Sequence, residues 1–462
     1  DDFFRLGGHS LLATRMISML RERLGVELPL REVFSHHTLS DLATAIDGAQ
    51  GARLPPIERA ERGEALPLSY AQERLWFLQV FRPESSSLNL SSHLDVTGGI
   101  DAEGVRAAVV DVVERHEIFR TIFFETPDGP RARIQSLDAL PPTFRYLDLR
   151  GGADEDARDR LTRELLERPF DLATEPPLRA GLIHVAGDRA ELLVCVHHIA
   201  ADGWTMANLT REVIEAYDRI QASAPPPPPP VPQYVDYAVW QRAHLGEAQL
   251  AGQLAYWRDA LAELEPLELP TDRRRPPVQS ARGASLEARI DPARLGGTED
   301  VAVGTPIAGR RAAETEDMLG CFRNTLVQRV RVRGRDSFAD LVDEVSRVNL
   351  AAQENQDVPF ERVIKELAPR RDLSRTPFFQ VFFNYLETLP QTKLERSGLA
   401  LAPRPPRSVE AKFDLELYVA PTEDHGLEVK AVYCADLFDP PTIEKLLASV
   451  LRVLREGLDD PA

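Results

Sequence analysis

Two adjacent histidines followed by an aspartate and a glycine form the strongest candidate for a reactive site. They lie in the segment CVHHIAADGW, where His197 and His198 precede Asp202, Gly203 and Trp204. Imidazole titrates near neutral pH, so a rigidly held histidine can act as a general base or hold a nucleophile by a hydrogen bond. The alternative is a pair of buried histidines bonded to the backbone, with Asp202 capping the next helix.

The residue types disfavour a metal at these histidines. Adjacent residues of a strand point to opposite faces of the sheet, and no third ligand lies nearby in the sequence, so no metal site is predicted. The three cysteines, Cys195, Cys321 and Cys434, lie far apart without a CxxC pair. This usage argues against a disulfide framework and fits a reducing cytosol, so we expect a cytoplasmic protein.

A second candidate is Ser10, in the segment GGHSLL. A serine after two glycines at the start of a helix is usually only an N-cap. The same place suits a phosphodiester on the hydroxyl, because the first N–H groups and the dipole of a helix favour negative charge. Spacing alone does not decide between these two roles.

The elements that must position these residues alternate along most of the chain. Helices are predicted at 71–79, 102–116, 157–167, 206–222 and 249–261, and strands at 178–185, 191–199, 326–332, 379–384, 414–420 and 428–433. The strand at 191–199 is apolar on both faces and ends at the histidines, and the helix that follows begins near Trp204. The alternation predicts an α/β architecture, and nearly 400 residues predict two lobes.

The N-terminal part has a different pattern. Residues 1–47 predict a small all-α helical unit that lacks a first piece, and residues 48–65 have the composition of a linker. Six consecutive prolines, Pro225–Pro230, predict a stiff surface segment that acts as a spacer or, less often, binds a proline-recognition domain.

Charge and hydropathy exclude two classes of partner. The 462 residues include 55 Lys+Arg and 73 Asp+Glu, a formal net charge of −18, so phosphate neutralisation of a nucleic acid is not expected. The apolar runs are much shorter than the roughly 20 residues that a membrane span requires. We therefore expect neither a nucleic acid nor a membrane as partner.

Both reactive segments belong to one ordered series of motifs. After GGHSLL the chain contains SYAQERLWFL (69–78), RHEIFRT (115–121), HHIAADG (197–203), YVDYAVWQ (234–241), GCFRNTL (320–326), QDVPFE (356–361) and RDLSRTP (371–377). The series resembles a carrier (thiolation) domain followed by a condensation domain of nonribosomal peptide synthetases, over nearly the whole chain. Loss of both histidines would mark a cyclisation domain, Asn324-Thr325 argues against an epimerisation domain, and SYAQERLWFL resembles the class that accepts an L-configured donor.

The resemblance implies a domain layout. A helical carrier would occupy 1–47, a linker 48–65, and an α/β two-lobed, chloramphenicol-acetyltransferase-like condensation domain 66–462. Its N-lobe would cover about 66–240 and its C-lobe about 241–462. The family has a helical stretch near 295–296 that this sequence lacks, so either residues are missing from the sequence there or the stretch is deleted.

The resemblance also implies an amide-forming reaction. Ser10 would carry phosphopantetheine with the donor acyl or peptidyl thioester, and the amine of an acceptor aminoacyl thioester would attack it. His198 would act as general base or position the amine, and His197 would be structural. Partners would be a downstream acceptor carrier, adenylation domains and a phosphopantetheinyl transferase. Alternatives are a CoA-dependent acyltransferase that uses the same motif without carriers, and a non-catalytic member that docks another protein.

The remaining motif residues have implied supporting roles. Asp202 would hold its loop by pairing with an arginine, for which Arg120 and Arg329 are candidates, and the Gly203 N–H would lie near the substrate carbonyl. The other residues carried over from the motifs are Arg115, Trp204, Trp240 and Asn324.

Overall fold

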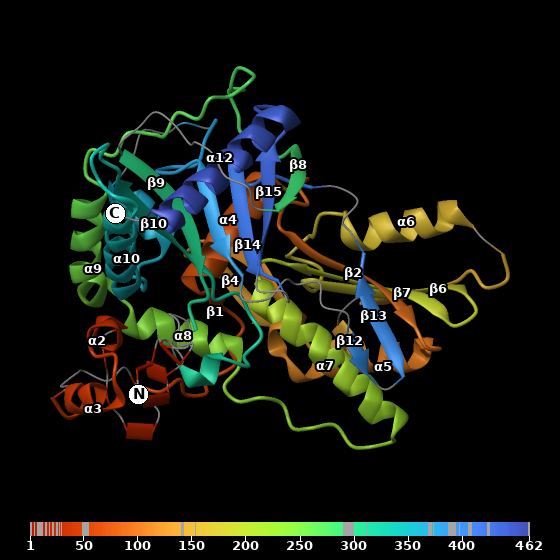
Figure 1. The fold of residues 1–462 in the computed structure, drawn as a ribbon. Coiled ribbons are helices and arrows are strands. Elements are labelled where there is room, and N and C mark those ends of the chain that lie inside the picture. The colour runs from red at the N-terminus through yellow and green to blue at the C-terminus, as the bar shows by residue number, and fades with distance from the viewer. Residues whose placement is uncertain are drawn as a thin grey trace.

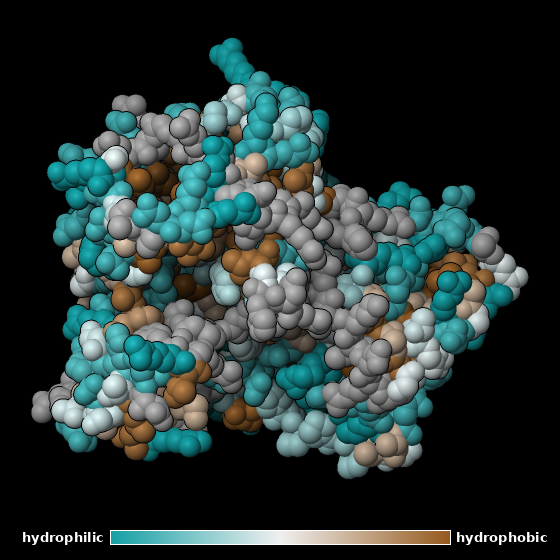
Figure 2. Space-filling model, viewed as in Figure 1, coloured by the Kyte–Doolittle hydropathy of each residue, from teal (hydrophilic) through white to brown (hydrophobic). Residues whose placement is uncertain are grey.

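The computed structural model describes residues 2–460 apart from 4, 7–12, 14–15, 18, 21–22, 25, 27, 29, 49–54, 140–142, 153, 290–299, 311, 368–371, 373, 387–393, 397, 405–408 and 423–425. Figure 1 shows two larger lobes and a small helical unit at the N-terminus. No helix in this described part combines the length and apolarity needed to cross a membrane. Hydrophilic residues dominate the face drawn in Figure 2, and apolar residues show on it mainly as small patches.

The regular elements described in the N-terminal unit are helices, as predicted. Described residues between 13 and 24 are helical, and they are followed by α2 (Leu30–Ser35) and α3 (Leu39–Gly48). Its small core consists of Ala13, Ile17, Leu28, Val33 and Leu42. Helix α2 lies against α10 (Phe338–Glu354) of the second lobe, where Arg31 forms an ion pair of 3.7 Å with Glu354.

The first lobe is built on a six-stranded sheet of order β12-β13-β2-β7-β6-β5. The strands are β2 (Asn89–Thr97), β5 (Phe144–Asp148), β6 (Leu178–Ala186), β7 (Arg189–His197), β12 (Leu394–Arg396) and β13 (Leu399–Pro403). Helices α5 (Ala102–Arg115) and α7 (Gly203–Gln221) pack on the face that carries Leu192 and Val194, and α6 (Glu155–Leu166) packs on the face that carries Leu193. Strand β7 is therefore covered on both faces, as its continuous apolar run predicts.

The second lobe has a six-stranded sheet of order β10-β9-β11-β14-β15-β8. Its strands are β8 (Gly283–Arg289), β9 (Asp300–Ile307), β10 (Asn324–Arg331), β11 (Val381–Tyr385), β14 (Leu415–Pro421) and β15 (Leu427–Cys434). Its helices are α9 (Glu247–Ala260), α10, α11 (Phe360–Leu367) and α12 (Pro440–Asp459). Strand β11 runs parallel to β9 and β14, and the other neighbouring pairs are antiparallel.

Two helices and a small sheet lie where the lobes meet. Helix α4 (Tyr70–Phe81) begins at Ser69, which forms a capping box with Gln72, and α8 (Tyr234–His244) follows the proline run. The small sheet has the order β1-β4-β3, from β1 (Leu66–Pro67), β3 (Thr121–Thr126) and β4 (Gly129–Ile134). Short 3-10 helices complete the described elements at Glu117–Arg120, Leu137–Ala139 and Ala313–Thr315.

The structure differs from the predicted lobe division at one place. Strand β13 pairs with β2, from Ala400 opposite Thr97 to Pro403 opposite Leu94, so a segment expected in the C-lobe completes the sheet of the first lobe. The physical reason is burial, because Leu399 and Leu401 belong to the core of the first lobe. The stretch near 295–296 lies outside the described residues, and residues 225–229 are exposed without regular structure.

Candidate active site

His198 follows the last residue of β7 and lies on the wall of a cavity between the lobes. Its backbone N–H donates to the Leu88 carbonyl at 2.8 Å, and the side chain is buried. The cavity has a volume of about 1020 Å³. Its walls come from α4, Cys321–Asn324, Pro359–Glu361 and Ala411–Phe413. A single buried imidazole therefore faces a space that both lobes enclose.

The surroundings of His198 keep its ring neutral. Burial lowers the pKa of His198 well below its ordinary value, and the charges of Arg323 and Lys412 lower it further. Its Nδ1 lies 3.7 Å from the Cys321 sulfur. Burial raises the pKa of that thiol to about 12, so the thiol keeps its proton. No other side-chain hydrogen bond to the ring occurs among the described residues, which leaves Nε2 available to a substrate.

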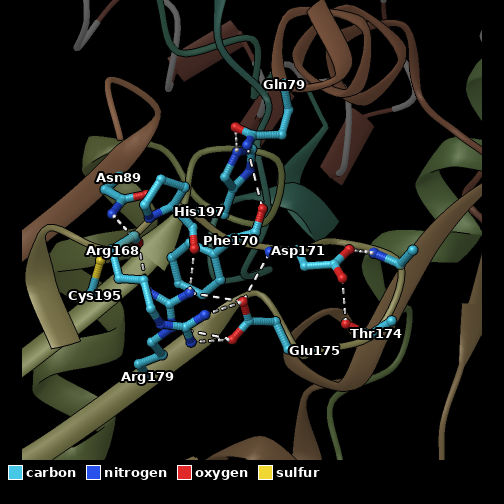
Figure 3. Close-up of polar contacts among 12 residues, drawn as sticks. Gln79, Asn89, Arg168, Phe170, Asp171, Thr174, Glu175, Arg179, Cys195 and His197 are labelled. Atoms are coloured by element: carbon cyan, nitrogen blue, oxygen red, sulfur yellow. Dashed lines mark hydrogen bonds and ion pairs between the residues drawn. The ribbon is translucent and has the colours of Figure 1, made fainter. Parts of the chain in front are cut away.

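His197 points away from His198 and has both ring nitrogens occupied. Nδ1 accepts a hydrogen bond from the Ile199 N–H at 3.1 Å, so Nε2 carries the proton and donates to the Gln79 side-chain oxygen at 3.1 Å (Figure 3). Its ring also meets Phe170 edge-on at 5.8 Å. Burial and then the Arg179 charge lower the pKa of His197 to about 3. This arrangement supports a structural role for His197.

A charged network supports the loop beneath His197. The Arg179 guanidinium lies 3.7 Å from the centre of the Phe170 ring and pairs with Glu175 at 2.8 Å (Figure 3). It also donates to the carbonyls of Arg168 and Pro169. These contacts fix residues 168–175 against β6 and β7, and so fix the strand that His198 follows.

Asp202 connects the loop that bears His198 to Arg310 and Phe322. It is the N-cap of α7, as predicted, and its Oδ1 accepts from the Thr205 N–H at 2.8 Å. Its Oδ2 accepts from the Phe322 N–H at 3.0 Å. The arginine that pairs with Asp202 is Arg310, whose Nη2 lies 3.4 Å from Oδ1.

Neither arginine predicted as the partner of Asp202, Arg120 or Arg329, reaches it. Arg120 donates to the Gln135 carbonyl at 2.8 Å, and Arg329 pairs with Asp300 at 2.7 Å. Arg310 was missed because it stands outside the motifs. The sequence feature next to Arg310 is Gly309, which adopts a left-handed φ of 66° in the structure.

The remaining motif residues have structural partners in the described part of the chain. Asn324 lines the cavity and donates to the carbonyls of Gln356 and Val358. Partners of the others are Asp111 and Glu212 for Arg115, the Glu316 carbonyl for Trp204, and the Pro55 carbonyl for Trp240. Except for Asn324, these residues hold elements together at a distance from His198's ring.

Two predicted site residues remain, Gly203 and Ser10. Gly203 is exposed at the first turn of α7, and a Cβ added there would meet no atom within 4 Å. The protein itself therefore does not require glycine at this position. Ser10 lies outside the described residues. Among the described residues, no group of three or more His, Cys, Asp or Glu side chains could hold a metal ion.

The cavity can be compared with the requirements of an acyl-phosphopantetheine arm. Pockets for drug-sized ligands measure roughly 300–1,000 Å³, so this one is large enough for an arm and its acyl group. Its lining is mixed, with apolar residues of α4 beside His198 and several arginines. The cavity therefore fits such a group, and Ser10 would hold its other end.

Comparison with known proteins gives a consistent result. Residues 63–295 and 293–462 match the family model of the condensation domain, and residues 1–46 match that of the phosphopantetheine attachment site. The chain is 38% identical over 502 residues to a dimodular nonribosomal peptide synthase of Bacillus subtilis, covering 100% of this chain and 21% of the relative. It is 37% identical over 490 residues to an isonitrile lipopeptide synthase of Mycobacterium tuberculosis, covering 96% and 19%.

The fold is also similar to solved structures. The X-domain from teicoplanin biosynthesis has a TM-score of 0.78 at 28% identity, covering 88% of this chain and 98% of that one. The starter condensation domain of rhizomide synthetase has a TM-score of 0.72 at 21% identity, covering 86% and 95%, and supports the fold alone. The chain spans about a fifth of the length of the two synthases above. This chain belongs to the nonribosomal peptide synthetases and contains a phosphopantetheine-attachment carrier followed by a condensation domain with a two-lobed α/β fold.

Proposed function

We propose that this chain forms an amide bond between two carrier-bound acyl groups, with the donor on its own carrier. The observation that carries the proposal is the neutral imidazole of His198 on the wall of a cavity that both lobes enclose. Phosphopantetheine on Ser10 would present the donor as a thioester, which is already activated. The main task left to the protein is alignment of the two groups, which can contribute roughly 7–11 kcal/mol.

In the reaction the amine nitrogen attacks the thioester carbonyl carbon. The C–N bond forms, the C–S bond breaks, and the proton lost by the nitrogen balances the thiolate that leaves. His198 is placed to handle this proton or to hold the amine. For Nε2 to accept the proton, Nδ1 must carry the ring's own proton and point it at the Cys321 sulfur.

We assign His198 mainly to holding the amine. A base is most effective when its pKa lies near the working pH, and burial lowers the pKa of His198 well below that range. A neutral Nε2 can still accept a hydrogen bond from the amine and orient its lone pair. In this proposal Asp202 positions the histidine loop through Phe322, and the contact of the Gly203 N–H with the substrate carbonyl stays a prediction from the motif.

The implied partners follow from this role. An acceptor carrier brings the amine, adenylation domains load both carriers, and a phosphopantetheinyl transferase modifies Ser10. The cytoplasm stays the predicted compartment, and the L-configured donor stays a prediction from the SYAQERLWFL segment.

Two experiments test the proposal. Ser10→Ala should show no phosphopantetheine adduct by intact-mass spectrometry after incubation with a transferase and CoA, whereas the unchanged chain gains one. His198→Ala, with the donor already loaded, should slow single-turnover amide formation with a separately supplied acceptor carrier. His244→Gln, on α8 away from the cavity wall, is the control and should keep the rate. An unchanged rate in His198→Ala would remove the assigned role.

One specific observation favours an alternative, a function in docking another protein. One matched structure is a complex of the X-domain with OxyB. Loaded carriers that give no amide with any acceptor, together with capture of a defined protein, would favour this alternative. A CoA-dependent acyltransferase would instead use acyl-CoA as donor with Ser10→Ala as effectively as with the unchanged chain.

A further inference from the structure

Two half-buried cationic side chains of the cavity lining, Arg323 and Lys412, form no ion pair among the described residues. Among the described residues, neither the Arg323 guanidinium nor the Lys412 ammonium forms a hydrogen bond or an ion pair, and both side chains line the cavity with His198. Three other arginines of the same lining are paired. Their partners are Glu361 for Arg74, Glu73 for Arg242, and Glu268 for Arg375.

A stack of aromatic rings places the two cations on the same wall. The Arg323 guanidinium lies over the Phe382 ring, 5.7 Å from its centre. Phe382 stacks on Phe413, with ring centres 4.7 Å apart and planes 7° from parallel. Phe413 directly follows Lys412, and both line the cavity. The two charges therefore lie at neighbouring positions of one apolar wall.

Hydrogen bonds fix the backbone at and beside both cations. Arg323 stands between Phe322, whose N–H donates to Asp202, and Asn324, whose side chain donates to two carbonyls. The Lys412 N–H donates to Glu416 at 2.6 Å, and its carbonyl accepts from Gln279 at 3.0 Å. A fixed backbone makes this pair a preorganised site.

The charges of two nearby acids, Glu416 and Glu410, offset the desolvation of Lys412 only in part. Glu416 accepts hydrogen bonds from the backbone of Lys412 and Phe413 and from the Tyr418 hydroxyl. Burial and then the charge of Arg323 lower the pKa of Lys412 to about 8. Two desolvated cations that repel each other are stabilised by an anion placed between them.

The position relative to His198 limits what that anion is. Arg323 is two residues from Cys321, whose sulfur lies 3.7 Å from His198 Nδ1, so the pair lies near the reacting groups. The phosphate of a carrier arm is separated from its thioester by the length of the pantetheine chain. An anion that a substrate carries to this place before the reaction therefore belongs to the acyl group.

We propose that Arg323 and Lys412 form a subsite for a carboxylate on the acyl group that one of the two thioesters presents to His198. The substrate class is an aminoacyl or peptidyl group with an acidic side chain, such as aspartyl or glutamyl. This inference rests on the proposed amide-forming function. The carboxylate arrives on the donor arm or on the acceptor arm, and the test separates these two sources.

The test compares substrates that differ only in charge. Aspartyl and asparaginyl groups, and glutamyl and glutaminyl groups, are placed on the donor arm or on the acceptor arm, with alanyl on the other arm. The full chain should condense the acidic group at least about tenfold faster than its amide on one arm, in single turnover at subsaturating partner. Affinity of the full chain for aspartyl-pantetheine over asparaginyl-pantetheine gives a readout that needs no turnover.

Variants assign the preference to the two residues. Arg323→Met and Lys412→Met should lose most of the acidic preference, measured as the ratio of the rates with the acidic group and with its amide. Arg375→Met, a paired cation of the same lining, should keep the preference, and thermal unfolding checks that each variant folds. Equal rates and affinities for acid and amide on both arms would overturn the subsite while leaving amide formation intact.

Two further outcomes would overturn it. A uniform loss of rate with acidic and neutral groups in both variants would mean that the cations serve the reaction itself. Absence of product with every pair would overturn the proposed function, and equal binding of the two pantetheine compounds would then overturn the subsite independently.

Discussion

The contact between Asp202 and Arg310 should stabilise the site measurably. Asp202→Ala removes the acceptor of three hydrogen bonds, from Thr205, Phe322 and Arg310, and leaves the buried guanidinium without its carboxylate. Removing one partner of a buried pair costs about 3–5 kcal/mol. Arg310 keeps its hydrogen bonds to backbone carbonyls at Thr315 and Met318, so we expect a loss of about 3 kcal/mol.

A double-mutant cycle isolates the pair. Asp202→Ala, Arg310→Met and the double variant are compared by urea unfolding followed by tryptophan fluorescence. Because the Nη2–Oδ1 distance is 3.4 Å, the coupling should be modest, with the double variant losing about 1–2 kcal/mol less than the sum of the single losses. Asp317→Ala, at an exposed acid 3.9 Å from Arg211, should change stability by less than about 0.5 kcal/mol.

The same variants test the link to His198. Asp202 holds the Phe322 N–H, and the neighbouring Cys321 contacts the His198 ring, so Asp202→Ala should lower the single-turnover rate even where the protein stays folded. Asp202→Asn keeps one acceptor oxygen, and its rate should fall between those of Asp202→Ala and the unchanged chain. Losses that add within about 0.5 kcal/mol, or a stability of Asp202→Ala equal to that of Asp317→Ala, would refute the reasoning.

Three other predictions concern the framework of the site. Burial lowers the pKa of His197 to about 3, so its contribution to the free energy of unfolding is full above pH 6.5. Below pH 6.5 the unfolded state takes up a proton, and the free energy of unfolding should fall by about 1.4 kcal/mol per pH unit. Urea unfolding of His197→Gln should lack this part of the pH dependence. Burial raises the pKa of Glu191, but hydrogen bonds from a histidine and an arginine and the charge of a second arginine lower it to about 2 overall. Glu191→Gln should therefore lower the free energy of unfolding by about 3 kcal/mol at pH 7. This difference should disappear as the pH falls from 4.5 toward 2, and a difference that does not depend on pH would contradict the prediction. Gly320→Ala would place a Cβ 1.8 Å from the buried Tyr234 ring and should lower the unfolding midpoint strongly, whereas Gly334→Ala, with no atom within 4 Å, should leave it nearly unchanged.

Local sequence patterns predicted β7 and α7, the strand and the helix that flank His198. The run from Leu192 to Val196 is apolar on both faces, and the structure covers β7 on both faces. Asp202 precedes α7 and caps it, as its type and place predict. Such features depend on neighbours within a few residues, so the sequence contains the information directly.

Long-range partners were not predictable in this way. Arg310 reaches Asp202 from 108 residues away, whereas the motifs pointed to Arg120 and Arg329. Strand β13 was assigned to the C-lobe by position along the chain, yet it completes the sheet of the first lobe. Its short apolar alternation fits the edge of either sheet, and only the burial of Leu399 and Leu401 decides between them.

By itself, the sequence determined the family, the order of carrier and condensation domains, and the segment that bears His198, because these follow from motifs and local periodicity. The tertiary structure alone decided that His198 is neutral, that Asp202 pairs with Arg310, and that Arg323 and Lys412 share one wall of the cavity. Burial and charge at a site depend on which distant segments pack there. A pKa and an ion-pair partner are therefore properties of the folded chain.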